Sequence, residues 1–169
     1  DIRRASRQRL LPSTPCESGG VYLITGGLGD VGLQIARWLA KRGPARLVLI
    51  SRAILPPRST WPSLLAEHSG SDLARRITAI VEIESLGAQV QIDSADVADA
   101  ASLGPCIEQI ERLWGGVDGV FHCAGLLKDS VVWNSSLAQI EEVLRPKAEG
   151  AWLLHRLTER FAVRMFVCM

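Results

Sequence analysis

The chain has 169 residues, of which 47% are apolar and 22% charged, and its formal net charge is +1. A globular chain of this length buries about 68–70% of its unfolded surface, so these values fit one folded domain and exclude a disordered polypeptide. The Lys and Arg residues are scattered rather than striped, and no apolar run approaches the ~18 residues of a membrane span. We therefore expect neither nucleic acid nor a membrane among the partners.

The N-terminal segment and the cysteines indicate the surroundings of this domain. Residues 1–18 are basic, then rich in Pro and Ser ahead of Gly19 and Gly20, and they lack the apolar stretch of a secretory signal. We interpret them as a linker or as the end of an upstream subdomain. The four cysteines form no CxxC pair, which disfavours a metal site and a disulfide framework. Buried, reduced thiols in a cytoplasmic protein are expected instead.

Strand and helix patterns alternate through the first half of the chain. The apolar runs 21–25 and 46–51 are typical of strands buried on both faces. Between them, an apolar stripe at every fourth residue predicts a helix that ends near Gly43. The residues of this stripe are Val31, Ile35 and Leu39. The proline-bearing stretch 53–72 is too long for a tight connection and predicts a surface insertion.

The same alternation continues in the second half. Further strands are predicted at 88–93, 117–125 and 163–169. Two helical stripes precede the first two of these strands, and their residues are Leu73, Ile77, Ile80 and Leu103, Ile107, Ile110. Ser136 and Gln139 have capping-box spacing for a last helix, which Pro146 is expected to break or restart.

This order of elements predicts an α/β fold, a Rossmann-like doubly wound parallel sheet with helices on both faces. Its Rossmann part spans residues 19–169, and we expect the sheet to be truncated in the fifth strand, where the sequence stops. Ligands of such sheets bind at the carboxyl ends of the strands, at the topological switch point.

A glycine motif follows the first predicted strand. Gly27, Gly29 and Gly32 form G-x-G-x-x-G at the start of a predicted helix. In this setting the first glycine permits the tight turn, the second lets the backbone approach a pyrophosphate, and the third lets the helix pack on the strand. The helix N-terminus offers free N–H groups to the phosphates, so the motif predicts a dinucleotide site. Asp30 is unexpected there, because a carboxylate repels phosphates unless it points to solvent.

The end of the second strand indicates which dinucleotide is bound. An NAD site places Asp or Glu about 20 residues after the glycines, where it binds the ribose 2′-hydroxyl. Here Ser51 and Arg52 occupy that place without a neighbouring acid. A guanidinium and a hydroxyl suit a 2′-phosphate, which favours NADPH, although a strand-end Ser-Arg pair can also be merely solvated.

Five segments carry a family resemblance: "YLITGGLGDVG", "LVLISR", "SADVAD", "GVFHCAG" and "LRPKAEGAWLLHRLT". In this order and spacing the chain resembles, from about residue 19 to 169, the ketoreductase domain of modular polyketide synthases and animal-type fatty acid synthases. These domains belong to the short-chain dehydrogenase/reductase superfamily. The insertion after Arg52 also resembles one found in some polyketide synthase ketoreductases.

The resemblance implies a role for each matching residue. Gly27, Leu28, Gly29, Asp30 and Val31 would surround the pyrophosphate, and Ser51 and Arg52 would hold the 2′-phosphate. Asp96 and Val97 would flank the adenine, and Cys123, Ala124 and Gly125 would line the nicotinamide-side ribose. Lys147 matches the active-site lysine of the family.

Several of these residues have a structural alternative. Asp96 is also a suitable N-cap for the helix that follows it. Lys147 would be a solvated surface lysine without the family motif. His122, at the end of a strand, is interpreted as a hydrogen-bonded, partly buried imidazole rather than a catalyst.

The resemblance implies an NADPH-dependent reduction of a β-ketoacyl thioester carried on an acyl carrier protein, next to other synthase domains. In the family, Ser and Tyr hydroxyls hold the carbonyl, Tyr donates the proton, and Lys lowers the pKa of the Tyr. These hydroxyl residues should follow the fifth strand, and Tyr22 in the first strand is the only tyrosine. We therefore expect a cofactor-binding part that is inactive alone.

Two other readings stay open. One is an inert NADP(H)-binding or scaffolding module, and the other is a free-standing short-chain dehydrogenase acting on a small alcohol or sugar. The second predicts an acidic residue near position 52, where Arg52 stands. The segment Leu127-Lys128-Asp129 partly matches the Leu-Asp-Asp of ketoreductases that give one hydroxyl configuration.

Overall fold

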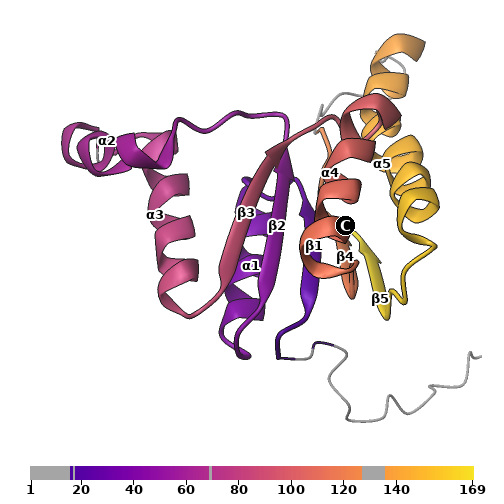
Figure 1. Ribbon diagram of the computed structural model, residues 1–169. Helices are drawn as coiled ribbons and strands as arrows, with labels where there is room; N and C mark the ends of the chain where they lie inside the picture. The colour runs from indigo at the N-terminus through magenta and orange to yellow at the C-terminus, as the bar shows by residue number, and fades with distance from the viewer. Residues whose placement is uncertain (1–15, 17, 69, 127–135) are drawn as a thin grey trace, which may run out of the picture.

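The computed structural model describes residues 16, 18–68, 70–126 and 136–169. Within them, five parallel strands form one sheet in the order β3-β2-β1-β4-β5 (Figure 1). The strands are β1 (Val21–Thr25), β2 (Arg46–Ser51), β3 (Gln89–Ser94), β4 (Gly119–His122) and β5 (Met165–Cys168). The predicted α/β class, a Rossmann-like doubly wound parallel sheet, is confirmed.

The helices divide between the two faces of the sheet. They are α1 (Asp30–Ala40), the 3-10 turn η1 (Arg58–Thr60), α2 (Trp61–Glu67), α3 (Asp72–Ser85), α4 (Ala100–Trp114) and α5 (Leu137–Thr158). The core around Tyr22 and Ile24 packs against α1, α2 and α3, whereas the core around Val21 and Leu23 packs against α4 and α5. Successive side chains of β1 thus enter opposite cores, which explains why its sequence is apolar without a break.

Two predicted helices differ in detail from the structure. In α1, Val31 is 51% exposed, and the buried residues are Gly32, Leu33, Ala36, Leu39 and Ala40. A stripe at every fourth residue drifts about 40° per step around a helix of 3.6 residues per turn, so Val31 lies off the buried face and Leu39 lies on it. The small residues Gly32 and Ala36 are buried instead, and Gly32 lets the first turn of α1 lie close to the backbone of Gly26 and Gly27.

The sequence predicted that Pro146 would break or restart the last helix. This prediction is wrong: α5 runs through Pro146 without interruption. The proline removes only one helical hydrogen bond. The capping box of Ser136 and Gln139 is present at the first turn, and Gly150, Leu154 and Thr158 are buried against the sheet side. The capping box thus stabilises the first turn before the proline, and burial stabilises the helix after it.

The insertion and the cysteines also refine the expectations. The stretch 53–72 carries η1 and α2, and its Trp61 is buried against the α3 side of the core. All four cysteines are free thiols, but Cys106 alone among them is buried, and Cys168 on β5 is exposed. In the part of the chain that is described, no helix is long and apolar enough to cross a membrane.

Candidate functional site

A cleft of about 820 Å³ opens at the carboxyl ends of β1, β2 and β4, between the glycine loop and α5. The chain runs outward from β1 to β2 and β3 on one side and from β4 to β5 on the other, so the cleft lies at the topological switch point. Nine of the predicted binding residues line it. They are Leu28, Gly29, Ser51, Arg52, Asp96, Val97, Cys123, Ala124 and Gly125.

The glycines of the loop are required by close backbone contacts. A Cβ on Gly27 would lie 2.7 Å from Leu49 Cβ, and a Cβ on Gly32 would lie 2.5 Å from the carbonyl oxygen of Gly26. Gly26, which the motif did not single out, has a φ of +63° and would place a Cβ 2.7 Å from the Cys123 carbonyl oxygen. The loop therefore packs against both β2 and the end of β4. At Gly29 a Cβ would meet only one backbone atom, at 3.2 Å, so this glycine borders open space in the cleft.

The N-terminus of α1 faces this open space. Gly29 is its N-cap and has no side chain, so no side-chain cap occupies the first-turn N–H groups. The Asp30 side chain is 79% exposed and pairs with Arg75 on α3 at 3.3 Å, which directs its charge away from the cleft. Asp30 and Val31 do not line the cleft. The carboxylate that seemed incompatible with phosphates is thus neutralised at the surface.

The end of β2 contributes a hydroxyl and a guanidinium. Ser51 Oγ accepts a hydrogen bond from the Ala53 N–H at 3.2 Å, which fixes the serine at the strand end. Arg52 is exposed, and no described carboxylate pairs with it. Its backbone carbonyl accepts a hydrogen bond from Ser94 Oγ at 3.4 Å, so β3 supports the segment that carries it.

Asp96 is not the N-cap of α4, the alternative considered from the sequence. Asp99 holds that position and accepts a hydrogen bond from the Ala101 N–H at 3.1 Å. Asp96 instead accepts one from the Ala98 N–H at 2.9 Å, closing a turn at the rim of the cleft. Val97 next to it is buried and would contact a Cβ placed on Gly150 at 2.9 Å, so it also seats α5.

Lys147 lies near the β4 end of the site without lining the cleft. Its Cε would be 3.2 Å from a Cβ on Gly125, so the lysine side chain runs along the backbone at this glycine. Lys147 is exposed, and the neighbouring Pro146 and Glu149 line the cleft.

Burial raises the pKa of the Cys123 thiol to about 11, which keeps this cleft residue neutral.

His122 is a satisfied imidazole, as the sequence analysis proposed. Its Nε2 donates to the Pro146 carbonyl at 2.9 Å, which leaves Nδ1 to accept a 2.7 Å hydrogen bond from the Thr25 hydroxyl. Thr25 Oγ1 in turn accepts from the Ala124 N–H at 3.4 Å. Burial lowers the pKa of His122, so the imidazole is neutral. This chain of hydrogen bonds joins β1, β4 and α5 directly beneath the cleft.

Several cleft residues carry no sequence motif. Arg76 on α3 lines the cleft on the side of Arg52. From α5, Arg145 reaches the Ala98 carbonyl at 3.5 Å and pairs with Glu149 at 3.6 Å. Glu141 and Glu142 add further carboxylates on that side. Helical position alone could not have identified these residues, because charged residues on a helix are ordinarily solvated.

Two further expectations concern a metal site and the configuration of the product. The described residues contain no cluster of His, Cys, Asp and Glu that could hold a metal ion. The segment Leu127-Lys128-Asp129, considered for the configuration of the product, lies outside the described residues.

Together, the cradle of the glycine loop, the uncapped N-terminus of α1 and the cleft at the switch point fit a dinucleotide, and they define a Rossmann-type nucleotide-binding domain. Comparison with known families makes this specific. Residues 20–169 match the model of the KR domain. The chain therefore belongs to the KR family of short-chain dehydrogenase/reductase-type ketoreductase domains, which implies an oxidoreductase that binds a nicotinamide cofactor.

Relatives among curated proteins include polyketide synthase PksL of Bacillus subtilis, which is 41% identical over 82% of this chain and 3% of the relative. The chain is 36% identical to 5-methyl-1-naphthoate synthase of Streptomyces sahachiroi, over 92% of this chain and 8% of the relative. It is 37% identical to 6-methylsalicylic acid synthase of Penicillium patulum, over 98% of this chain and 10% of the relative. The chain thus spans about a tenth or less of these proteins.

Solved structures agree with this assignment. An N-terminal ketoreductase from the macrolactin assembly line is 30% identical, with a TM-score of 0.74 over 94% of this chain and 29% of that one. A ketoreductase domain from the bacillaene assembly line is 29% identical, with a TM-score of 0.73 over 88% of this chain and 32% of that one.

Proposed function

We propose that this chain binds NADPH and serves a ketoreductase that reduces a β-ketoacyl thioester, carried on an acyl carrier protein, to the β-hydroxyacyl thioester. The observation that carries the choice of cofactor is the end of β2, where Ser51 and Arg52 line the cleft. An acidic residue at this place would repel a 2′-phosphate, whereas a guanidinium binds phosphate with two hydrogen bonds.

Each part of the cleft has a task in this proposal. Gly29 and the first turn of α1 hold the pyrophosphate, and Asp96 and Val97 border the adenine. Cys123, Ala124 and Gly125 border the nicotinamide ribose, beside which Lys147 lies. NADPH supplies the hydride when bound. The lysine ammonium would hold the ribose hydroxyls and favour the anionic form of a nearby proton donor.

The proton donor is not among residues 1–169 in this proposal. Tyr22 is the only tyrosine of the sequence, and its side chain is buried in the core between β1 and α1. The chain is thus expected to bind the cofactor without turnover. The relatives are long synthases, which supports neighbouring domains and a carrier protein as the source of the remaining groups and of the substrate.

The test is a fluorescence titration of the purified chain with NADPH and NADH. We expect tighter binding of NADPH, and Arg52→Ala should weaken it about 10- to 100-fold while changing NADH binding little, because a charge-assisted hydrogen bond contributes about 1.5–3 kcal/mol. Arg42→Ala is the matched control, since Arg42 stacks on Trp38 at 4.0 Å and does not line the cleft. Failure of the folded chain to bind either nucleotide would overturn the proposal and favour a scaffolding module.

A second assay addresses turnover. The chain is mixed with NADPH and a short β-ketoacyl thioester, and oxidation of NADPH is followed by absorbance. No oxidation above the rate without protein is expected. Steady oxidation that depends on the thioester would show that a residue of this chain donates the proton, and it would refute the division of tasks proposed here.

A further inference from the structure

Two neighbouring arginines on α3 have different surroundings. Arg75 is exposed and pairs with Asp30 at 3.3 Å and with Asp72 at 3.0 Å. Arg76 is half-buried and lines the cleft together with Ser51 and Arg52. Because successive helical residues point about 100° apart, one arginine faces the surface and the next faces the site.

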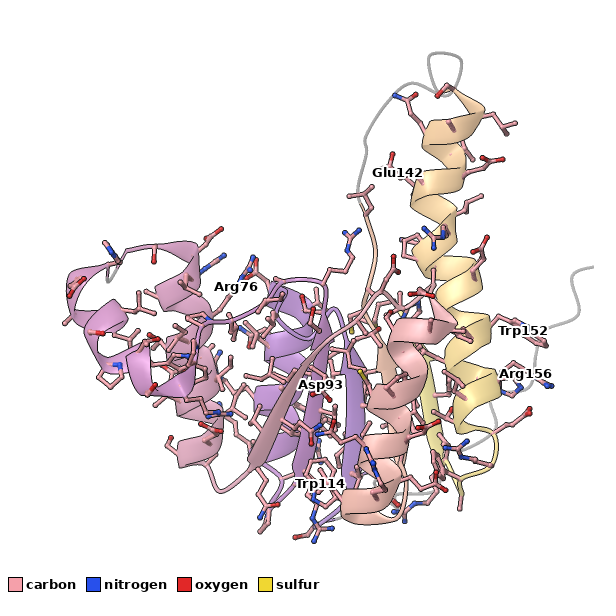
Figure 2. The ribbon with its side chains drawn as sticks, turned by 45° about the horizontal axis from the view of Figure 1, so that its top comes forward. Arg76, Asp93, Trp114, Glu142, Trp152 and Arg156 are labelled. Atoms are coloured by element: carbon pink, nitrogen blue, oxygen red, sulfur yellow. The ribbon has the colours of Figure 1, made fainter. Side chains whose placement is uncertain are left out.

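Arg76 has no carboxylate partner within the described part of the chain. Arg145, the third arginine of the cleft, pairs with Glu149. The carboxylates contributed by helices to the cleft all come from α5, on the opposite side. In Figure 2, Arg76 lies on the α3 side near the top of the sheet, and Glu142 lies high on α5. Asp96, which follows β3, also lines the cleft, but it accepts a hydrogen bond from the Ala98 N–H and pairs with neither arginine, so this end carries two guanidiniums and one carboxylate.

Two guanidiniums at one end of a cleft repel each other, and the partial burial of Arg76 increases the cost. An anion between them would reverse this effect. The pyrophosphate has its own donors in the glycine loop and the first turn of α1. The remaining anionic group of the dinucleotide is the 2′-phosphate, which as a monoester carries close to two negative charges at pH 7.

We propose that Arg76 is a second binding residue for the adenosine 2′-phosphate and forms a two-arginine clamp with Arg52. This inference rests on the proposed binding of NADPH. The clamp joins two elements, since Arg52 follows β2 and Arg76 belongs to α3. The position of α3 is fixed by Ile77, Ile80 and Ile83, which are buried in the core, and by an ion pair between Arg37 on α1 and Glu82. Arg76 is thus held at the site before the nucleotide arrives.

The test compares Arg76→Ala with Arg75→Ala, which removes the same side chain one position away. Dissociation constants for NADPH and NADH are measured by fluorescence titration, and folding is checked by circular dichroism. Arg76→Ala should weaken NADPH binding about 10-fold or more and leave NADH within about 3-fold, whereas Arg75→Ala should change either by less than about 5-fold. Arg76→Lys, which keeps the charge and loses the fork, should recover part of the loss.

Competition by 2′,5′-ADP and 5′-ADP provides a second readout. The advantage of 2′,5′-ADP should fall in Arg76→Ala and fall further in the double variant with Arg52→Ala. Equal weakening of NADPH and NADH would place Arg76 at the pyrophosphate and overturn the inference. NADPH binding that requires Arg52 and is unaffected by Arg76→Ala would overturn it while leaving the proposed function intact. Absence of binding in the unsubstituted chain would overturn both.

Discussion

The two sides of the cleft are built differently. On the β2 and α3 side, Arg52 and Arg76 lie at the cleft without a described carboxylate partner. On the β4 and α5 side, His122 is bonded at both ring nitrogens and Arg145 has a carboxylate partner. In the proposed function, the first side leaves its charges for the ligand, and the second uses its polar groups to fix the protein. Under this proposal, specificity and positioning are assigned to separate elements of one site.

The junction of the two sides is the glycine loop, where we expect the largest effect. Gly32→Ala places a Cβ 2.5 Å from Gly26 O and 2.8 Å from Gly27 Cα, both backbone atoms that no rotamer change can move. We expect a loss of about 3 kcal/mol in the free energy of unfolding and loss of nucleotide binding. Denaturant melts and NADPH titrations measure both.

Gly104→Ala is the control for this change, because a Cβ there meets nothing within 4 Å inside α4. It should raise the free energy of unfolding by up to about 1 kcal/mol, as expected for removal of a glycine from a helix. Unchanged stability and binding in Gly32→Ala would show that the loop is not the rigid junction described here.

On the β4 and α5 side of the cleft, His122 should make the free energy of unfolding depend on pH. Burial lowers the pKa of His122 from its usual 6.5, so below about pH 6.5 the unfolded chain takes up a proton that the folded chain does not. The contribution of His122 to the free energy of unfolding should therefore be complete above pH 6.5. It should decrease as the pH falls below that value, by up to about 1.4 kcal/mol per pH unit.

His122→Ala tests the assignment of this pH dependence. At pH 7.5 the variant should lose about 1–3 kcal/mol, because the Thr25 hydroxyl and the Pro146 carbonyl lose their buried partner. Its free energy of unfolding should depend less on pH between 7.5 and 5.5 than that of the unsubstituted chain. Equal pH dependence of the two proteins would remove His122 as the source.

The smallest effect on nucleotide affinity is expected from a surface residue near the β2 and α3 side of the cleft. Asp30→Asn removes the partner of Arg75 in an ion pair whose side chains are 60% and 79% exposed. Such pairs contribute about 0–1 kcal/mol, so NADPH affinity should change by less than about fivefold. A larger change, seen by the same titration, would show that the Asp30 charge acts on the bound phosphates.

The sequence was most informative where local patterns decide the structure. The apolar runs of β1 and β2 are confirmed, as is the capping box that starts α5, because burial on both faces and first-turn hydrogen bonds depend on neighbouring residues. The expected break at Pro146 was wrong, since the packing of α5 on the sheet outweighs one missing hydrogen bond. The position of a long helix is therefore decided by tertiary contacts.

Residues of the site could be predicted when they lie close together in the sequence. Gly27, Gly29 and Gly32 lie within one short motif and could be interpreted together. Arg76 belongs to no motif, and Thr25 lies in "YLITGGLGDVG" without an assigned role. The fold places Arg76 at the cleft and brings Thr25 to His122, so neither position could be interpreted from neighbouring residues. Asp96 was ambiguous because Asp99 is an equally suitable N-cap three residues later. Only the turn geometry distinguishes the two.

Pro146 divides α5 into two parts with different tolerance to change. Before it, Leu137, Ile140 and Leu144 are 71%, 40% and 52% exposed, and Glu141 and Glu142 line the cleft. After it, Gly150 and Leu154 are buried, and His122 binds the proline carbonyl itself. The first part can exchange side chains at little cost in folding, while the second keeps Lys147 at Gly125. Such a helix would allow the side chains that border the cleft to diverge among related chains without displacing the part that packs on the sheet.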